Sequence, residues 1–225
     1  MKEYFKFPST PYIVLPEECI RKDKVLPLDE LEELLCHEII IEEKIDGANL
    51  GISFDDEGNL LLQNRGSWLT TPFTGQWKIM EDWIGKRKER LFDFLLNKYI
   101  LFGEWCYATH SIYYDKLPDY FIGFDLYDKK QQKFLSVYKR NELLIEMGLS
   151  VIKQYARGVF QLNELPQFFS KSAYGDNLCE GIYIRWDEDE WLKKRAKLVR
   201  NDFRQKIDGH WSSQILKKND VKYYL

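Results

Sequence analysis

The sequence predicts an α+β fold in which antiparallel sheets are flanked by helices. Short runs of β-branched and aromatic residues recur along the chain and are separated by turn signals, as expected for antiparallel strands. A smaller number of segments carry apolar residues at helical spacing. The chain has 225 residues, of which 44% are hydrophobic, so it can bury one large core. We therefore expect a single domain over residues 1–225.

The first elements are a short helix followed by a strand, a bend and a hairpin. The segment DELEELLCHE predicts a helix over 29–38 with Asp29 as its N-cap. Residues 39–65 combine β-branched runs with the turn DDEG, which predicts a strand and a hairpin with Lys44 at the bend between them. Residues 75–98 have apolar residues at helical spacing, interrupted by Gly85, and predict one long helix or two short ones.

The second half of the chain alternates strands and short helices. The runs YILFGEWCYA, DYFIGFDLYD and KFLSVY predict strands. RNELLIEMG predicts a helix that ends at Gly148, and NELPQFFSK predicts a helix with Pro166 in its first turn. LCEGIYIRW and WLKKRAKLVR predict two strands joined by the acidic turn DEDE, and DFRQKIDGHW predicts a basic helix.

Composition argues against a zinc protein and against a membrane protein. The four cysteines and three histidines are scattered and form no CxxC pair, unlike the ligands of a zinc site. The first residues, MKEYFKFPST, lack the apolar stretch of a signal peptide, and no window approaches the roughly 18 apolar residues that span a bilayer. We expect a cytoplasmic protein without a membrane partner.

Charge is distributed unevenly along the chain. The net charge of −3 argues weakly against a nucleic-acid partner. Residues 191–222 nevertheless hold ten Lys or Arg and three Asp, a local charge of +7 that leaves −10 for the remainder. This basic end could be a solvated face, but it overlaps the motif RAKLVR, which favours a surface that faces phosphates.

Six short motifs carry the candidate chemistry. In chain order they are Lys44-Ile45-Asp46-Gly47, Arg65 after the hairpin, Glu104 in LFGEW, Phe124-Asp125, Glu180-Gly181, and Arg195-Ala196-Lys197. Together they resemble the lysine nucleotidyltransferase superfamily of ATP-dependent DNA and RNA ligases and mRNA capping enzymes, over residues 42–200. The resemblance is strongest to the RNA ligases, because Asn49 completes their KxxGxN pattern. It implies a nucleotidyltransferase (ATP-grasp-like ligase) domain.

The resemblance implies that Lys44 attacks the α-phosphate of ATP and becomes covalently bound to AMP. The amine must be neutral to attack, yet a free lysine has a pKa of about 10.4, so on the order of one in a thousand is neutral near pH 7.4. Glu42, Glu43 and Asp46 would hold the amine charged. Lys197 and a divalent metal are therefore expected to balance these carboxylates. The alternative for Lys44 is an ordinary hairpin lysine beside a turn glycine.

The resemblance also assigns roles to other residues. Catalytic roles fall to Lys44, Glu104 and Lys197. Nucleotide contacts fall to Glu43, Ile45, Gly47, Asn49, Arg65, Phe124, Glu180, Tyr183, Arg195 and Lys197. Phe124 would stack on the purine unless it is a core residue, and either Tyr183 or Ile184 would cover the other side of the base. Asp46, Glu104 and Glu180 form the oxygen-rich ligand set that suits Mg²⁺ or Mn²⁺.

The C-terminal tail is the candidate RNA-binding segment. Ligases and capping enzymes usually append an OB-type or helical domain, whereas 25 residues follow Arg200, so we expect no such domain. The basic residues that would contact RNA are Arg200, Arg204, Lys206, Lys217 and Lys218. Without a separate clamp, an accessory RNA-binding protein would help sealing.

The functional hypothesis is an ATP-dependent RNA ligase that transfers AMP from Lys44 to an RNA 5′-phosphate and seals it to a 3′-OH. The enzyme alternatives are a DNA nick ligase and a GTP-dependent capping-type transferase, and Asn49 and the small size favour RNA ligase over both. A catalytically silent nucleotide- or RNA-binding module is the alternative from another class. The motifs leave open whether the RNA is a nicked duplex, a tRNA loop or a single strand.

Overall fold

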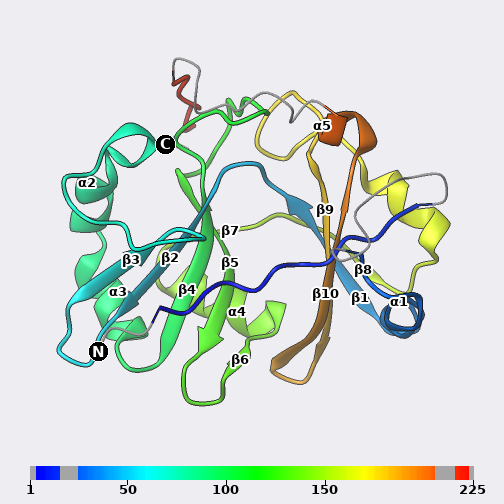
Figure 1. Cartoon of the computed structure of the whole chain (residues 1–225), viewed down its shortest axis with the longest axis horizontal. Coiled ribbons are helices and arrows are strands. Elements are labelled where there is room, and N and C mark those ends of the chain that lie inside the picture. The colour runs from blue at the N-terminus through cyan, green and yellow to red at the C-terminus, as the bar shows by residue number, and fades with distance from the viewer. Residues whose placement is uncertain (1–3, 16–24, 206–215, 223–225) are drawn as a thin grey trace.

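Two antiparallel sheets lie side by side in the computed structural model, which describes residues 4–15, 25–205 and 216–222. Figure 1 shows helices on the outer side of each sheet. The first sheet has the order β10-β9-β1-β8. Its strands are β1 (Ile39–Lys44), β8 (Gln154–Gly158), β9 (Gly181–Glu188) and β10 (Trp191–Val199). This arrangement confirms the predicted α+β fold with antiparallel sheets.

The second sheet has the order β3-β2-β4-β5-β6, with the short strand β7 pairing in parallel with β5. Its strands are β2 (Ala48–Phe54), β3 (Leu60–Gln63), β4 (Tyr99–Trp105), β5 (Phe121–Asp128), β6 (Lys133–Phe134) and β7 (Ser150–Val151). The described helices are α1 (Leu28–Leu35), α2 (Met80–Gly85), α3 (Lys88–Leu95), α4 (Val137–Glu146) and α5 (Asn201–Gln205), with 3₁₀ turns at Gly75–Trp77 and Leu162–Phe168.

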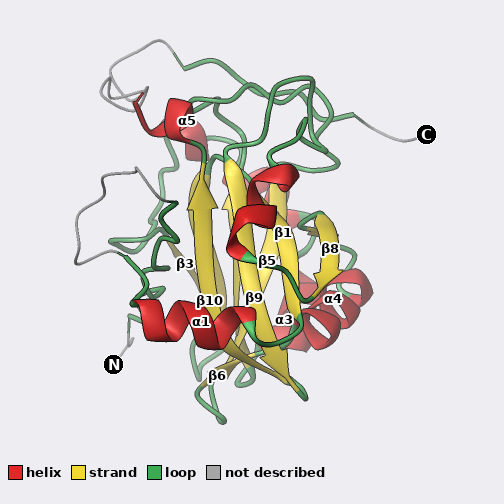
Figure 2. Ribbon diagram, turned by 90° about the vertical axis from the view of Figure 1, so that its right-hand side faces the viewer, coloured by secondary structure: helices red, strands yellow, loops and turns green. Residues whose placement is uncertain are grey.

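Each sheet buries its outer face under its own helices. Leu31 and Leu34 of α1 pack with Ile39 and Ile41 of β1, and Figure 2 shows α1 lying across β9 and β10. On the other side, α2 and α3 cover the apolar face of β2 and β4. Because side chains alternate along a strand, the inner faces of the sheets are left to line the space between them.

Between β1 and β2 the chain crosses from the first sheet to the second at a sharp bend. β1 ends at Lys44 and β2 begins at Ala48, so only three residues join the two sheets here. A side chain at Gly47 would place its Cβ 2.8 Å from the Trp105 carbonyl oxygen and 2.9 Å from Cγ of Glu104. Glycine is therefore required for the bend to pass so close to β4.

Several predicted element boundaries need correction. The N-cap of α1 is Pro27, without a side-chain cap, and Asp29 lies in the first turn of the helix. The predicted strand KFLSVY is a strand only at Lys133–Phe134, because Ser136 caps α4 by accepting a hydrogen bond from the Lys139 amide. The segment with Pro166 is 3₁₀ rather than α-helical.

Two further predictions depend on which residues are described. Residues 75–98 form the two short helices α2 and α3 after a 3₁₀ turn, as one of the alternatives predicted. The basic helix predicted over 202–211 is described only as far as Gln205. Among the described residues, no helix combines the length and apolar character needed to cross a bilayer.

Candidate active site

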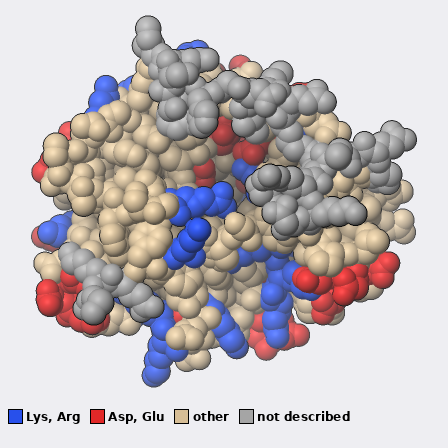
Figure 3. Space-filling model, in the orientation of Figure 1, with Lys and Arg blue, Asp and Glu red and all other residues tan. Residues whose placement is uncertain are grey.

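A cavity of about 380 Å³ lies between the two sheets, at the end where β1 crosses into β2. Figure 3 shows a hollow on this face, with acidic side chains inside it and basic side chains beside it. Both sheets and the loops above them line the cavity: Phe7, Thr10, Glu42, Glu43, Lys44, Ile45, Asp46, Gly47, Asn49, Arg65, Glu104, His110, Ser111, Phe124, Ile152, Glu180, Tyr183, Lys197 and Phe203. Residues from most of the six motifs thus meet in one place.

Lys44 forms an ion pair with Glu180 inside this cavity. The Lys44 Nζ donates a hydrogen bond to Oε2 of Glu180 at 2.6 Å. Burial lowers the pKa of Lys44, but the negative charges of Glu180, Glu104 and Asp46 outweigh it and raise that pKa above its ordinary value. The carboxylates around the amine therefore keep it protonated. This is the state expected when no added cation balances those carboxylates.

Glu104 is a carboxyl group in the same cavity whose ionisation is disfavoured. It lies on β4 opposite Asn49 of β2. Burial raises its pKa to about 8; Lys44 opposes this rise, whereas Glu180 and Asp46 add to it. The pKa of Glu180 is raised as well, by burial, although Lys44 opposes the rise. Lys44 and Arg65 attract Glu104, and Lys44 and Lys197 attract Glu180, but this attraction does not outweigh burial.

Asp46 connects the bend to the loop above the cavity. Its carboxylate accepts hydrogen bonds from the backbone amides of Ser111 at 2.7 Å and Ile112 at 3.0 Å. Its own amide donates to the Tyr114 hydroxyl at 2.8 Å. One oxygen of Asp46 is thus committed to positioning the loop that holds His110 and Ser111.

Two predicted nucleotide contacts have their side chains engaged elsewhere. The Glu43 carboxylate lies on the opposite face of β1 and accepts hydrogen bonds from the Tyr155 hydroxyl at 2.7 Å, the Ser172 hydroxyl and the Ala173 amide. Arg195 is not among the residues that line the cavity. Its guanidinium pairs with Asp125 and lies 4.1 Å from the centre of the Phe134 ring.

Behind the cavity, a cluster of buried charges joins the two sheets to α4. Arg140 is fully buried and forms an ion pair with Glu42. It also donates a hydrogen bond to the carbonyl oxygen of Phe124 at 2.5 Å. Arg185 donates to the same carbonyl at 3.3 Å and pairs with Asp125. Phe124 thus lines the cavity while two arginines fix its backbone.

Sequence reasoning missed several lining residues and this buried cluster. Phe7 and Thr10 come from the N-terminal segment, where the Thr10 hydroxyl is hydrogen-bonded to that of Tyr183. Ring Nε2 of His110 lies 2.9 Å from Oε1 of Gln76, and burial lowers the pKa of His110. Isolated residues of this kind carry no local pattern. Of the alternatives Tyr183 and Ile184, Tyr183 lines the cavity and Ile184 is in the core under α1.

The predicted RNA-binding residues that the structure describes do not line the cavity. Lys217 and Lys218 are exposed. Arg200 has a side chain that is 12% exposed and lies 3.5 Å from Asp202. The side chain of Arg204 and all of Lys206 lie outside the described residues.

The residues of the cavity fit a divalent metal only with further ligands. Among the described residues, no group of three or more His, Cys, Asp or Glu side chains forms a ready-made metal site. Burial nevertheless raises the pKa values of Glu104 and Glu180, and neighbouring carboxylates add to both rises. Oδ1 of Asn49 is also buried without a hydrogen-bond partner in the described chain. This arrangement suits Mg²⁺ or Mn²⁺, which keep several waters and bind few carboxylates.

Comparison with known proteins agrees with this geometry. The sequence model of the RNA ligase family matches residues 37–199. No curated protein matches the sequence significantly. A mutant of Naegleria gruberi RNA ligase with ATP and Mn has a TM-score of 0.66 at 16% identity, covering 81% of this chain and 56% of that chain. The same ligase with PPi has a TM-score of 0.63 at 17% identity, covering 81% and 55%. Another mutant with ATP and Mn has a TM-score of 0.63 at 14% identity, covering 92% and 63%.

The structural likeness places the two sheets in the nucleotidyltransferase fold of the RNA ligases. The chain spans between 55% and 63% of the length of the three structures compared. Because the family model matches most of its length, the chain belongs to the RNA ligase family.

Proposed function

We propose that this protein is an ATP-dependent RNA ligase that carries AMP on Lys44. The observation that carries the proposal is the position of the Lys44 amine, paired with Glu180 in a cavity that Glu104 and Lys197 also line. Membership of the RNA ligase family and the ATP and Mn bound to the N. gruberi enzyme support the same reaction.

The first step would join AMP to the protein. The Lys44 nitrogen attacks the α-phosphorus of ATP, a nitrogen–phosphorus bond forms, and the bond to pyrophosphate breaks while the amine loses its protons. Lys197, whose Nζ lies 4.0 Å from the centre of the Tyr12 ring, faces the cavity and would stabilise charge on the α-phosphate. Phe124 would stack against the base, a contact worth roughly 1 to 3 kcal/mol.

Loss of the proton requires a change in the electrostatics of the cavity. The carboxylates raise the pKa of Lys44, so the amine becomes a nucleophile only when added positive charge offsets them. Asp46, Glu104 and Glu180 would hold a divalent metal together with water and phosphate oxygens. Bound there, the metal would neutralise these carboxylates and the phosphate charge.

The later steps would transfer AMP to RNA and seal the strand. An oxygen of the RNA 5′-phosphate attacks the AMP phosphorus, the nitrogen–phosphorus bond breaks, and Lys44 regains its proton. A 3′-OH then attacks the RNA phosphorus and displaces AMP as a phosphodiester forms. Arg65, exposed at the edge of the cavity, would contact a ribose or the RNA 5′-phosphate.

Labelling with α-labelled nucleotide tests the proposal directly. The protein is incubated with labelled ATP or GTP and Mg²⁺ or Mn²⁺, and then separated by denaturing electrophoresis. We expect retained label with ATP and no label in Lys44→Ala. The control Lys98→Ala, which changes an exposed lysine in the turn between α3 and β4, should be labelled normally. Label with GTP alone would indicate a capping-type transferase, and no label with either would indicate a binding module.

The adenylated protein then tests the polynucleotide substrate. Nicked duplexes, cleaved loops and single strands of RNA are compared with matched DNA, each with a 5′-phosphate and a 3′-OH. We expect sealed RNA products. Equal or faster sealing of DNA would identify a DNA nick ligase instead.

A further inference from the structure

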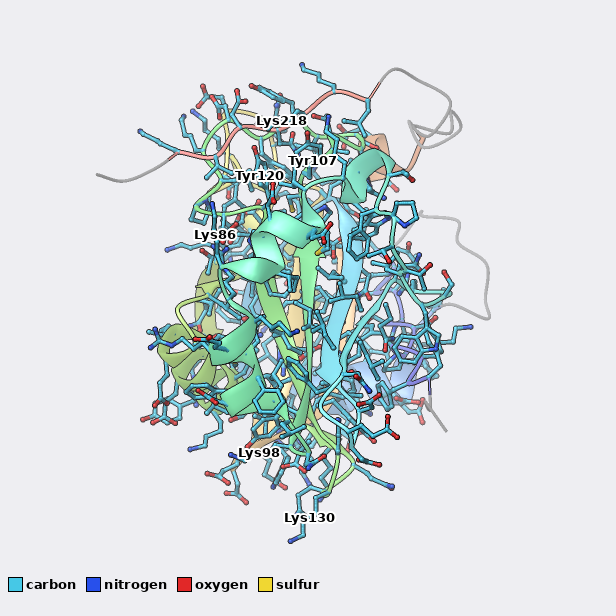
Figure 4. The ribbon with its side chains drawn as sticks, turned by 90° about the vertical axis from the view of Figure 1, so that its left-hand side faces the viewer. Lys86, Lys98, Tyr107, Tyr120, Lys130 and Lys218 are labelled. Atoms are coloured by element: carbon cyan, nitrogen blue, oxygen red, sulfur yellow. The ribbon has the colours of Figure 1, made fainter. Side chains whose placement is uncertain are left out.

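A group of lysines surrounds tyrosine rings beside the loop that holds His110 and Ser111. Lys218 Nζ lies 5.5 Å from the centre of the Tyr120 ring and 5.9 Å from that of Tyr107. Lys78 Nζ lies 5.5 Å from the same Tyr107 ring, on the α2 side. Figure 4 shows Tyr107, Tyr120 and Lys218 together at one end of this face. We call Lys78, Lys217, Lys218, Tyr107, Tyr113 and Tyr120 the tyrosine–lysine surface.

The rings hold the lysine side chains without neutralising them. Lys217 Nζ lies 4.2 Å from the centre of the Tyr113 ring. Tyr107 and Tyr120 contact each other edge to face, with ring centroids 5.2 Å apart. A cation over an aromatic ring keeps its full charge, because the ring contributes only a quadrupole. Two carboxylates contact tyrosines of this surface: Asp220 accepts a hydrogen bond from the Tyr113 hydroxyl, and Asp119 accepts one from the Tyr120 amide.

Asn219 attaches Lys217 and Lys218 to the segment that leads into the cavity-lining residues His110 and Ser111. It is fully buried, and its side-chain amide donates to the carbonyl oxygens of Cys106 at 2.9 Å and Ala108 at 3.2 Å. Its Oδ1 accepts from the Thr109 hydroxyl and from the Tyr114 amide. Lys217 and Lys218 are therefore fixed against the segment that continues into His110 and Ser111.

We propose that the tyrosine–lysine surface binds the phosphodiester backbone of the RNA strand whose end enters the cavity. This inference rests on the proposed function and identifies where the substrate strand lies. Ammonium groups suit phosphates, since each acts as a point charge with three donors. The surface carries three lysines on a protein with a net charge of −3 and adjoins a cavity that would take nucleotide phosphates. A phosphate backbone reaching that cavity would pass over it.

Paired charge variants test the inference. Lys217→Gln/Lys218→Gln is compared with the control Lys98→Gln/Lys130→Gln, which removes two lysines at the opposite end of the same face (Figure 4). Binding of a labelled, 5′-phosphorylated single-stranded RNA is measured by fluorescence anisotropy without ATP, between about 50 and 200 mM salt. Because no nucleotide is added, the result is independent of whether Lys44 is adenylated.

We expect the first variant to lose about tenfold in affinity at low salt, and its salt slope to fall by about 1.4 for two lost phosphate contacts. Lys78→Gln should add a further loss, and the control should bind like the original protein. Unchanged melting temperatures would show that all variants are folded. Equal affinity in the two double variants, or competition by polyglutamate as strong as by unlabelled RNA, would overturn the inference.

Discussion

Two groups of buried charges lie next to each other between the sheets, and their electrostatics differ. The pocket cluster consists of Lys44, Asp46, Glu104 and Glu180. The arginine cluster behind it consists of Arg140, Arg185 and Arg195 with Glu42, Asp125 and Asp187. Each of these two clusters contains residues from both sheets.

Asp125 of the arginine cluster and Glu104 of the pocket cluster respond differently to burial, whereas burial raises the pKa of Asp187 in the arginine cluster. Burial would raise the pKa of Asp125, but the charges of Arg195, Arg185 and Arg140 outweigh it and lower that pKa. In the pocket cluster, burial and neighbouring carboxylates raise the pKa of Glu104 to about 8 against the attraction of Lys44. In the arginine cluster the arginines outweigh burial at Asp125, whereas in the pocket cluster burial outweighs the attraction of Lys44 and Arg65 at Glu104. Such a difference is expected when the pocket cluster binds a ligand and the arginine cluster supports the fold.

Phe124 belongs to both regions, because its carbonyl oxygen accepts hydrogen bonds from Arg140 and Arg185 while its ring lines the cavity. The arginine cluster and the cavity are therefore linked through the backbone of Phe124. Removing charges from each region should therefore change stability in opposite directions.

The largest effect is expected from breaking the arginine cluster. Arg140→Met leaves the Glu42 carboxylate buried without its partner and removes the shorter of the two hydrogen bonds to the Phe124 carbonyl oxygen, so that only the one from Arg185 remains. We expect a loss of about 3–5 kcal/mol in the free energy of unfolding, measured with urea. The control Arg157→Met, whose ion pair with Glu38 is exposed, should lose about 0–1 kcal/mol. Similar losses in both variants would contradict the assigned role.

Removing a carboxylate from the pocket cluster should stabilise the protein instead. Because the folded protein raises the pKa of Glu104, ionisation of this group costs stability as pH rises from about 4.3, its unfolded value, to about 8. With a chelator present, Glu104→Gln should therefore match the original protein near pH 4 and exceed it by about 1–3 kcal/mol at pH 8. The variant should also lose AMP labelling.

The control for this experiment is Glu146→Gln, an exposed carboxylate on α4. Its unfolding free energy should follow that of the original protein at every pH. A constant difference between Glu104→Gln and the original protein across the pH range would refute the titration argument.

The next effect separates the ring of Phe124 from its backbone. Phe124→Leu keeps the carbonyl oxygen that the arginines hold but removes the ring from the cavity. The KM for ATP in AMP labelling should rise about tenfold, as expected for a lost stacking contact of 1 to 3 kcal/mol. The control Phe160→Leu, a half-buried ring that packs against the core under α1, should leave the KM unchanged. An unchanged KM in Phe124→Leu would assign the ring to the core alone.

The smallest effect is stabilisation by the metal itself. Mn²⁺ at about ten times its dissociation constant should add about 1.4 kcal/mol to the unfolding free energy, measured by thermal denaturation without nucleotide. This increase in the unfolding free energy should disappear in the double variant Glu104→Gln/Glu180→Gln. It should remain in the control Arg157→Met. An equal response in the double variant would place the metal elsewhere.

The sequence predicted the elements that local patterns specify. The run IIIEEK, the bend with Gly47 and the hairpin after it follow from residues close in the chain, and so do α2 and α3. Asp29 as an N-cap and KFLSVY as a strand were wrong, because Pro27 and Ser136 start the adjoining helices. Alternation along β1 could have placed Glu43 on the face opposite Lys44, since successive side chains point to opposite faces.

By itself, the sequence determined which side chains are proposed to carry the chemistry, because Lys44, Glu104, Glu180 and Lys197 occur in a recognisable order. Only the tertiary structure decided their surroundings. Arg140 reaches Glu42 across 98 positions, and Asn219 reaches Cys106 across 113. No local pattern encodes such contacts, since they arise when the two sheets close over the same space. Arg195 shows the consequence. Its motif predicted a contact with the nucleotide, but in the folded protein its guanidinium pairs with Asp125.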